Sequence, residues 1–335
     1  MSRIYYFKSG KINRFYRQIK KTAKENGRNP LAMFADFLYC SFKFGAGLSD
    51  YINFKFYNMK NKERREYVTV VDCDKFYALL SPDKYKKFFT IKPDFLKNFK
   101  KYISRDYCTY EMGFEKFNSF LENNAEFMLK PIDGLGGHGV RRVETREIED
   151  RRSFFEALNT EGLFVEGYVV QHSEMSAFSE NSVNTLRIMT YANNDESFIF
   201  YAIMRVGRGA QVDNFHQGGL ACKVDVETGR LVGKAMDKLG EEFEEHPVSK
   251  IKFDGFRIPN WDYVVKMVNE AALVNQNIHV VGWDVAVLED GATFIEGNRR
   301  PGWDLVQSLD RCGSKFRMRE ILQRYNEDEK KKDEK

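Results

Sequence analysis

The sequence predicts an α+β protein in which a helical N-terminal region precedes a larger part that combines strands with helices. Over residues 10–70 the apolar residues recur every three or four positions, which is the period of an amphipathic helix. From about residue 126 the period changes to two, in runs rich in Val, Ile, Phe and Tyr that are typical of strands. The change of period along one chain predicts these two parts.

The elements follow in order along the chain. The first helices include LAMFADFLYCSF and YINFKFYNM, and Gly45-Ala46-Gly47 separates them. Predicted strands are EFMLK, LFVEGYVV, TLRIMTYA, SFIFYAIMRV, LACKVDV and the pair GWDVAVL and ATFIEGN. Turn signals at Asn193-Asn194-Asp195, Thr228-Gly229 and Glu289-Asp290-Gly291 bound several of them. The helical period returns over residues 262–277 and 314–325, and the last ten residues, NEDEKKKDEK, are too charged to be buried.

Length and composition set the class of protein. A chain of 335 residues with 42% hydrophobic content can bury a large core in two or three lobes. Its five cysteines are odd in number and contain no C-x-x-C pair, so neither a disulfide framework nor a zinc site is predicted, and a reducing cytosol is favoured. The start MSRIYYFKSGK lacks an apolar signal core, and Asp36 interrupts the most apolar early stretch. We therefore expect neither a secretion signal nor a membrane span.

Charge is distributed unevenly along the chain. Residues 1–100 contain 22 Lys and Arg against 9 Asp and Glu, a net charge of +13, which leaves −9 for the rest of a chain whose total is +4. Such a basic segment is compatible with anionic lipid, nucleic acid or a phosphorylated substrate, but a solvated set of amphipathic helices is the favoured interpretation. No base-stacking signature accompanies the charge, so nucleic acid is not a predicted partner.

A lysine ends one predicted strand directly before a glycine-rich segment, in FMLKPIDGLGGHGV, residues 127–140. Glycine lets backbone N–H groups approach phosphate oxygens, and the ammonium of Lys130 adds a point charge for them. The segment matches neither the P-loop, in which the lysine follows the glycines, nor the Rossmann fingerprint. Taken alone, it is compatible with a phosphate-binding lid and with an ordinary hairpin turn.

A second pattern, GWDVAVLEDGATFIEGN, predicts a hairpin that brings Asp284, Glu296 and Asn298 together. Since residues i and i+2 of a strand point to the same face, Glu296 and Asn298 project together, and Gly297 leaves room between them. Mg²⁺ needs only a few protein oxygens beside substrate phosphate and water. The three residues are therefore the predicted metal site. Their alternative role, as polar residues on an exposed hairpin, is disfavoured by the apolar strands around them.

With these patterns in this order, residues 90–310 resemble the ATP-grasp superfamily, whose members hold ATP and Mg²⁺ between two lobes and form amide or related bonds through acyl-phosphates. The resemblance implies an ATP-grasp fold of two α+β lobes preceded by a helical N-terminal region. The implied parts are a helical basic region over residues 1–75, a small lobe with a glycine-rich lid over 76–166, a C-terminal lobe with the metal hairpin over 167–325, and a charged tail over 326–335.

The resemblance also implies roles for individual residues. FVEGYVVQHSEM resembles the hinge strand that meets adenine and the ribose, and NTLRI and IMRVGRG carry arginines where ribosomal-protein glutamate ligases have phosphate-facing ones. The implied nucleotide-binding residues are Lys92, Lys130, Gly136, Gly137, His138, Glu166, Tyr168, Val169, Glu174 and Asn184. The implied catalytic residues are Lys130, Arg187 and Arg205.

Three positions stay open or depart from the pattern. The upstream ATP lysine is either Lys84 or Lys92, and Lys92 is favoured because phenylalanines and Arg105 follow it as they do in the family. His138 either contacts phosphate or is a solvated lid residue. D-alanine:D-alanine ligases carry an arginine two residues before the metal aspartate, where this chain has Gly282.

A narrower resemblance comes from FGAGLSDYINFKFYNMKNKERREYV together with SVNTLRI, DNFHQGG and EGNRRPGWDLVQ. These segments resemble the sugar-transfer-associated ATP-grasp family, which is linked to bacterial capsular and surface polysaccharide assembly. The implied function is ATP- and Mg²⁺-dependent ligation of a carboxylate to an amine through an acyl-phosphate, on a sugar or amino-acid component. A phosphotransferase acting on a hydroxyl, and a nucleotide-binding scaffold for glycosyltransferases, are the alternatives. The implied partners are small-molecule or sugar-linked substrates, and the implied location is the cytoplasm or the inner membrane face.

Overall fold

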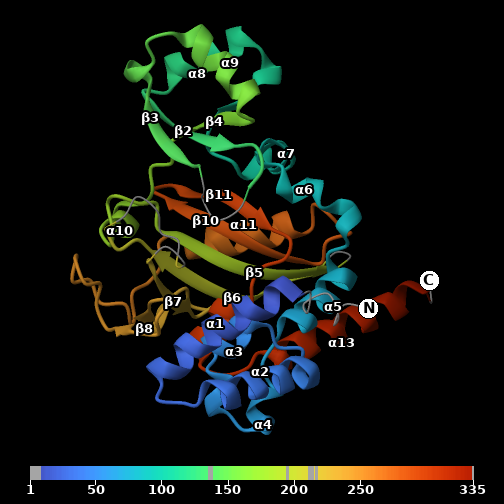
Figure 1. Cartoon of the computed structure of the whole chain (residues 1–335). Coiled ribbons are helices and arrows are strands. Elements are labelled where there is room, and N and C mark those ends of the chain that lie inside the picture. The colour runs from blue at the N-terminus through green and yellow to red at the C-terminus, as the bar shows by residue number, and fades with distance from the viewer. Residues whose placement is uncertain (1–8, 135–138, 194–195, 210–214, 216–217, 334–335) are drawn as a thin grey trace. The chain divides into compact units, whose positions relative to one another are not determined.

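The computed structural model describes residues 9–134, 139–193, 196–209, 215 and 218–333 (Figure 1). Contacts divide the chain into two units, one of Met1–Leu80 with Gly302–Lys335 and one of Ser81–Pro301. In the described residues the first unit contains helices and no strand, and the second contains both sheets. None of the described helices is both long enough and apolar enough to cross a bilayer.

The helical unit confirms the helices predicted near the N-terminus. Asn29 caps one of them through its side-chain oxygen, which accepts from the backbone N–H groups of Leu31 and Ala32, and Gly45 ends the same helix with φ of 72°. The main helices of this unit are α1 (Ser9–Glu25), α2 (Pro30–Phe44), α3 (Leu48–Asn53), α4 (Asn61–Arg64), α5 (Val70–Leu80), α12 (Asp304–Asp310) and α13 (Lys315–Asp333).

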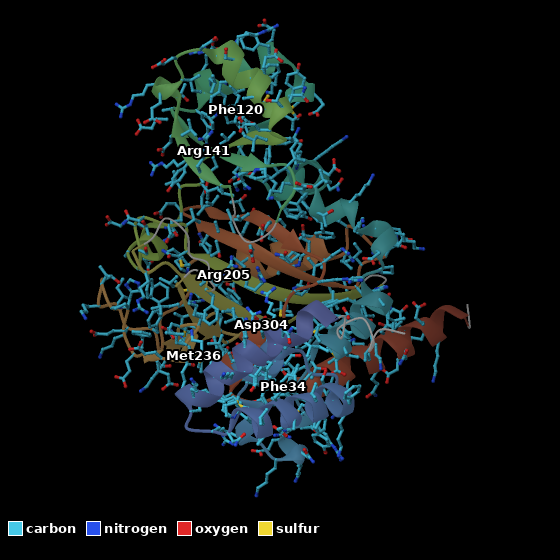
Figure 2. All side chains as sticks on the ribbon, in the orientation of Figure 1. Phe34, Phe120, Arg141, Arg205, Met236 and Asp304 are labelled. Carbon is cyan, nitrogen blue, oxygen red and sulfur yellow. The ribbon has the colours of Figure 1, made fainter. Side chains whose placement is uncertain are left out.

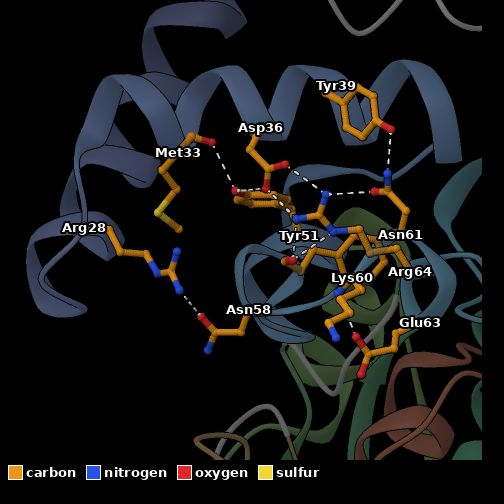
Figure 3. Close-up of polar contacts among 11 residues, drawn as sticks. Arg28, Met33, Asp36, Tyr39, Tyr51, Asn58, Lys60, Asn61, Glu63 and Arg64 are labelled. Carbon is orange, nitrogen blue, oxygen red and sulfur yellow. Dashed lines mark hydrogen bonds and ion pairs between the residues drawn. The ribbon is translucent and has the colours of Figure 1, made fainter.

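A buried ion pair sits among the aromatic residues of this unit. The guanidinium of Arg64, 8% exposed, forms two bonds of 2.8 and 2.9 Å with the carboxylate of Asp36 and donates to the Phe56 carbonyl at 3.0 Å (Figure 3). The Tyr51 hydroxyl donates to the same carboxylate at 2.9 Å. Since these bonds use the donors of the fork together, Arg64 can be buried without an unpaired charge.

The C-terminal segment belongs with these helices. The side-chain amide of Gln307 accepts from the Val68 N–H at 2.7 Å and donates to the Val68 carbonyl at 3.1 Å. The sequence placed residues 302–325 in the C-terminal lobe, and the contacts group them with the N-terminal helices instead. Residues 326–333, predicted as a charged tail, continue α13, because a helix satisfies its own backbone hydrogen bonds without burial.

The second unit begins with a four-stranded antiparallel sheet in the order β1-β4-β2-β3. Phenylalanines of α8 and α9 form a core with this sheet, in which Phe117 and Phe127 are fully buried. Figure 2 labels Phe120 and Arg141 in this part of the chain. The elements are α6 (Lys87–Thr90), α7 (Lys92–Asn98), β1 (Tyr107–Cys108), α8 (Phe114–Asn123), β2 (Glu126–Pro131), β3 (Arg141–Glu144), α9 (Arg151–Thr160) and β4 (Leu163–Gly167).

A seven-stranded antiparallel sheet follows, in the order β11-β10-β5-β6-β7-β8-β9. Helix α11 packs its buried residues Val264, Val268 and Ala271 into the core of this sheet, which also contains the fully buried Trp283. The strands are β5 (Thr185–Asn193), β6 (Glu196–Val206), β7 (Leu220–Val224), β8 (Leu231–Met236), β9 (Glu242–Phe243), β10 (Val280–Leu288) and β11 (Gly291–Asn298), with α10 (Ser173–Ser176) before them and α11 (Trp261–Ala272) between β9 and β10. The seven predicted strands are confirmed as β2, β4, β5, β6, β7, β10 and β11, whereas β1, β3, β8 and β9 are not predicted from the sequence.

Candidate active site

A cavity of about 550 Å³ lies in the second unit, and residues of both sheets line it. The four-stranded sheet and the segment after β4 contribute Met128, Lys130, Arg142 and Glu166 to Val169. The seven-stranded sheet contributes Thr185, Arg205, Asp284, Ile295 and Glu296. Charged groups of both signs therefore meet in one concave site, which is the usual setting of a binding or active site.

Lys130 lies at the end of β2 and is paired with Glu166 of the neighbouring strand β4. The second carboxylate oxygen of Glu166 accepts from the Arg105 guanidinium at 3.1 Å, and Arg105 also donates to the Phe294 carbonyl at 2.6 Å. Burial raises the pKa of Glu166, but Arg105 and Lys130 together outweigh it and hold that pKa below its usual range. The Glu166 carboxylate thus pairs with two cations, and through Arg105 it connects β4 to the Phe294 carbonyl of β11.

Lys92 starts α7 and lines the cavity, whereas Lys84 is exposed and does not. The ammonium of Lys92 donates to the carbonyls of Pro131 at 3.2 Å and Gly134 at 3.0 Å, next to the glycine-rich segment. Burial lowers the pKa of Lys92. Of the two lysines that the sequence left open, Lys92 is therefore the one that lies at the cavity.

Asp284 lies on β10, directly between Glu296 of β11 and Arg187 of β5. Its carboxylate accepts from the guanidinium groups of Arg187 and Arg205, each at 3.0 Å to Oδ2. Figure 2 labels Arg205, which comes from β6. Burial raises the pKa of Asp284, but the two arginines outweigh it and lower that pKa to about 2. Asp284 is therefore charged at neutral pH.

Two glycines set the packing around this carboxylate. A Cβ at Gly297 would lie 2.6 Å from a ring carbon of Phe95 and 2.8 Å from one of Phe89, so this glycine allows β11 to approach the rings. That role differs from the predicted one, which was to leave room between Glu296 and Asn298. A Cβ at Gly282 would lie 2.7 Å from Pro301 and 3.4 Å from the Arg187 side chain, so Arg187 packs against the position where D-alanine:D-alanine ligases carry an arginine.

The hairpin residues have the chemistry of a magnesium site. The Asn298 amide donates to Glu296 at 3.1 Å, and burial together with the charge of Asp284 raises the pKa of Glu296. A divalent cation would relieve that repulsion. In the described residues no three His, Cys, Asp or Glu side chains are grouped closely enough to hold a metal. The candidate donors of the hairpin are two carboxylates and one amide. This set fits Mg²⁺, which keeps water and phosphate ligands.

The segment that follows β4 lies at the other side of the cavity, where Gly167, Tyr168 and Val169 line it. The Tyr168 ring stacks under the Arg142 guanidinium at 4.5 Å. A Cβ at Gly167 would lie 2.9 Å from the Asn124 side-chain oxygen, which explains the glycine. The predicted adenine-facing backbone therefore lies at the cavity.

Other predicted residues lie away from it. Glu174 is exposed on α10 and does not line the cavity, but Glu180, which the sequence did not single out, does. Asn184 is fully buried, and its amide donates to the Met175 carbonyl at 2.8 Å and accepts from the Gly207 N–H at 3.1 Å. Asn184 thus holds two chain segments together. Gly136, Gly137 and His138 lie outside the described residues.

Comparison with known proteins identifies relatives. The family described as sugar-transfer associated ATP-grasp matches residues 53–322. No curated protein matches the chain. Similar solved structures include the ATP-grasp ligase PsnB complexed with minimal precursor, at 13% identity over 72% of this chain and 63% of that chain, with a TM-score of 0.43.

Two further structures are similar. A biotin carboxylase from Campylobacter jejuni is 11% identical over 66% of this chain and 43% of that chain, with a TM-score of 0.43. An L-amino acid ligase from Bacillus licheniformis is 12% identical over 66% of this chain and 42% of that chain, with a TM-score of 0.38. The chain spans less than two thirds of the length of each of these proteins.

Proposed function

The chain belongs to the sugar-transfer-associated ATP-grasp family, and we propose on this premise that it is an ATP- and Mg²⁺-dependent ligase that joins a carboxylate to an amine through an acyl-phosphate. Its α+β architecture is then the ATP-grasp fold, as the sequence predicted. One observation carries the proposal: Lys130, Arg205, Asp284 and Glu296 line a single cavity.

The cations of this cavity suit a nucleoside triphosphate. Lys92, Lys130 and Arg205 line it from three different elements, and phosphoryl transfer depends mainly on positioning and on neutralising charge at the phosphate oxygens. The backbone at Tyr168 and Val169 offers amide groups for the adenine base. In this proposal Glu166 keeps the Lys130 ammonium in place, and Arg105 keeps Glu166 in place.

Asp284, Glu296 and Asn298 would hold Mg²⁺. When bound, the metal would neutralise charge on the phosphate oxygens of the nucleotide. Arg187 and Arg205 keep Asp284 ionised and fixed in position, so the carboxylate is ready to accept a cation at neutral pH.

A second cavity of about 240 Å³ supports a place for the carboxylate substrate. It shares Lys92, Lys130 and Glu296 with the first cavity, and Arg299 and Arg300 also line it. Guanidinium groups bind carboxylates through paired hydrogen bonds. In the reaction, a carboxylate oxygen bonds to the γ-phosphorus while the bond to the β–γ bridging oxygen breaks and ADP leaves. The amine nitrogen then bonds to the acyl carbon, inorganic phosphate leaves, and the amine proton passes to solvent.

We further propose that the substrate is a sugar or amino-acid component of a bacterial capsular or surface polysaccharide, handled in the cytoplasm or at the inner membrane face. The family's association with sugar transfer supports this substrate class. The net charge of +13 on residues 1–100 supports a nearby anionic surface, and glycosyltransferases are the expected protein partners.

Phosphate release from ATP and Mg²⁺, measured over a panel of amino acids and sugar acids with mass spectrometry of the products, tests the ligase. We expect phosphate to be released only when both a carboxylate and an amine are present. We also expect the product to be an amide. A phosphorylated hydroxyl formed without an amine would identify a phosphotransferase instead. If no pair of carboxylate and amine gives turnover but the protein still binds ATP, the result would support a nucleotide-binding scaffold for glycosyltransferases instead.

Glu296→Ala tests the site within the same assay. We expect it to abolish turnover while the protein stays folded, because Glu296 coordinates metal in this proposal. Glu122→Ala is the matched control, since Glu122 is an exposed glutamate of α8 outside the cavity. Normal Mg²⁺-dependent turnover by Glu296→Ala would overturn the site.

A further inference from the structure

The helical unit contains a cavity of its own, of about 330 Å³, which we call the cationic pocket. Four cationic side chains line it, those of Lys43, Arg65, Lys75 and Lys315, and Asp72 is the one carboxylate in its lining. The lining therefore carries a net charge of +3. Its volume lies at the lower end of the range of roughly 300–1,000 Å³ that is usual for small-molecule sites.

Asp72 balances only one of these cations. Its carboxylate pairs with the Lys315 ammonium at 2.9 Å and accepts from the N–H and the hydroxyl of Thr69 at 2.9 and 2.8 Å. Within the described residues, Lys43, Arg65 and Lys75 have no carboxylate within 4 Å. Lys43 donates instead to the Tyr39 hydroxyl, which is neutral. Three like charges thus share one concave surface without a counter-ion from the part of the chain that the structure describes, an arrangement that attracts anions.

Backbone contacts fix the segments that carry these cations. Gly45 ends α2, and a Cβ there would lie 2.7 Å from Val71 of α5, so the two helices approach closely. The Thr69 hydroxyl donates to the Phe44 carbonyl at 3.0 Å. The Lys315 N–H donates to the Glu66 carbonyl at 2.9 Å. The pocket is therefore built from three stretches of the chain, 43–45, 65–75 and the start of α13, that hydrogen bonds and close packing hold in place.

Of the two adjacent arginines, Arg64 and Arg65, only Arg65 lines the pocket. Arg64 is buried and bonded to Asp36 (Figure 3) and to the Phe56 carbonyl. Arg65, the next residue, is exposed and lines the pocket. An arginine fork together with lysine ammonium groups is the usual composition of a phosphate site, because the fork donates two parallel hydrogen bonds and the ammonium groups add point charges.

We propose that the cationic pocket is a binding site for a phosphate-bearing ligand, separate from the ATP-binding cavity. A phosphate monoester carries about −1.5 to −2 charge at neutral pH, and a diphosphate carries more, which matches the three unbalanced cations. The ligand is either a soluble phosphorylated metabolite or the phosphate headgroup of a lipid. Both sources present the same group to the pocket, and the experiment separates them.

Amine-reactive footprinting of the whole protein tests the site, with inorganic pyrophosphate as the probe and sodium chloride at equal ionic strength as the reference. Acetylation of Lys43 and Lys75, read by mass spectrometry, should slow by about tenfold at ten times the dissociation constant, by mass action. Lys62, which is exposed on α4 outside the pocket, should be labelled at an unchanged rate. Because the readout is at the pocket, pyrophosphate binding at the ATP cavity does not affect it.

Arg65→Glu should weaken the protection of Lys43 and Lys75 by at least about tenfold, since it removes a charge-assisted fork and adds a repulsive charge. Lys62→Glu, with the same change of charge, should leave protection intact. Circular dichroism checks the fold, and if Arg65→Glu does not fold, Lys75→Gln with the readout at Lys43 replaces it. Protection that persists in the folded pocket variant, or equal protection of Lys62, would overturn the site.

Vesicles identify the source of the phosphate. One set of vesicles contains phosphatidic acid in phosphatidylcholine, and the other contains phosphatidylcholine alone. If only the first set protects Lys43 and Lys75 from acetylation, the ligand is a lipid headgroup. Protection by pyrophosphate without protection by vesicles supports a soluble ligand. Protection by neither probe would refute the proposal.

Discussion

Replacing Glu166 with glutamine tests whether the charge network beside the large cavity also stabilises the fold. The side chains of Glu166, Arg105 and Lys130 are 4%, 3% and 11% exposed. Glutamine keeps the shape of the side chain but removes the charge that both cations share, and breaking a buried ion pair in this way costs about 3–5 kcal/mol. Lys130→Met leaves Glu166 paired with Arg105, so we expect a smaller loss of about 1–3 kcal/mol.

Urea unfolding followed by tryptophan fluorescence measures both losses. Trp283 is fully buried and stacks on Phe294 at 4.7 Å between ring centroids, so its emission reports the unit that contains Glu166. Trp303 belongs to the helical unit, and a Trp303→Phe background removes its signal. Added salt should leave the difference between the variants unchanged, because buried charges are weakly screened. A loss for Glu166→Gln no greater than that for Lys130→Met would refute this reasoning.

Three further predictions concern the rest of the chain. Gly297→Ala should cost about 1–3 kcal/mol and lower ATP turnover, because its Cβ would collide with the rings of Phe95 and Phe89; unchanged melting and turnover would contradict this. Burial raises the pKa of Asp50 from 3.8 to about 6, so the free energy of unfolding should fall by roughly 3 kcal/mol as pH rises through that window. Urea titrations at a series of pH values measure this fall, and Asp50→Asn should remove the dependence of the unfolding free energy on pH in that window. Of the five cysteines Cys312 alone is exposed, so iodoacetamide at mildly alkaline pH should rapidly add one label by mass spectrometry; fast double labelling would contradict the burial.

The predicted elements are those whose side chains repeat with a clear period. The run SFIFYAIMRV lies in β6, and its apolar residues show a period because the strand buries them. The glycines at 45 and 47 lie between helices α2 and α3, as predicted. Strands β1 and β9 contain two residues each, which is too short for any period to be visible. β8 has six residues and is longer than the predicted β7, but three exposed residues in a row, Val232 to Lys234, interrupt its period of two. Short length hid β1 and β9, and a broken period hid β8.

The pairing within the β10–β11 hairpin could be predicted because its residues are close in sequence, and strand register alone brings Asp284 opposite Glu296. Arg105 could not be, because its role depends on a contact with Glu166, 61 positions later. Glu174 and Glu180 illustrate the same limit. The two glutamates are six positions apart, and the path of the chain around α10, rather than the residue type, decides which of them reaches the cavity.

The pairing of Val68 with Gln307 has a consequence for protein synthesis. The two residues are 239 positions apart, and all of Ser81–Pro301 is translated between them. At about 5–20 residues per second, the ribosome needs roughly 10–50 s to produce that interval. During this time Gln307 has not been made, so water rather than the Gln307 amide bonds the backbone groups of Val68. The segment around Val68 is therefore made before the whole of Ser81–Pro301 and reaches its final hydrogen bonding only after it.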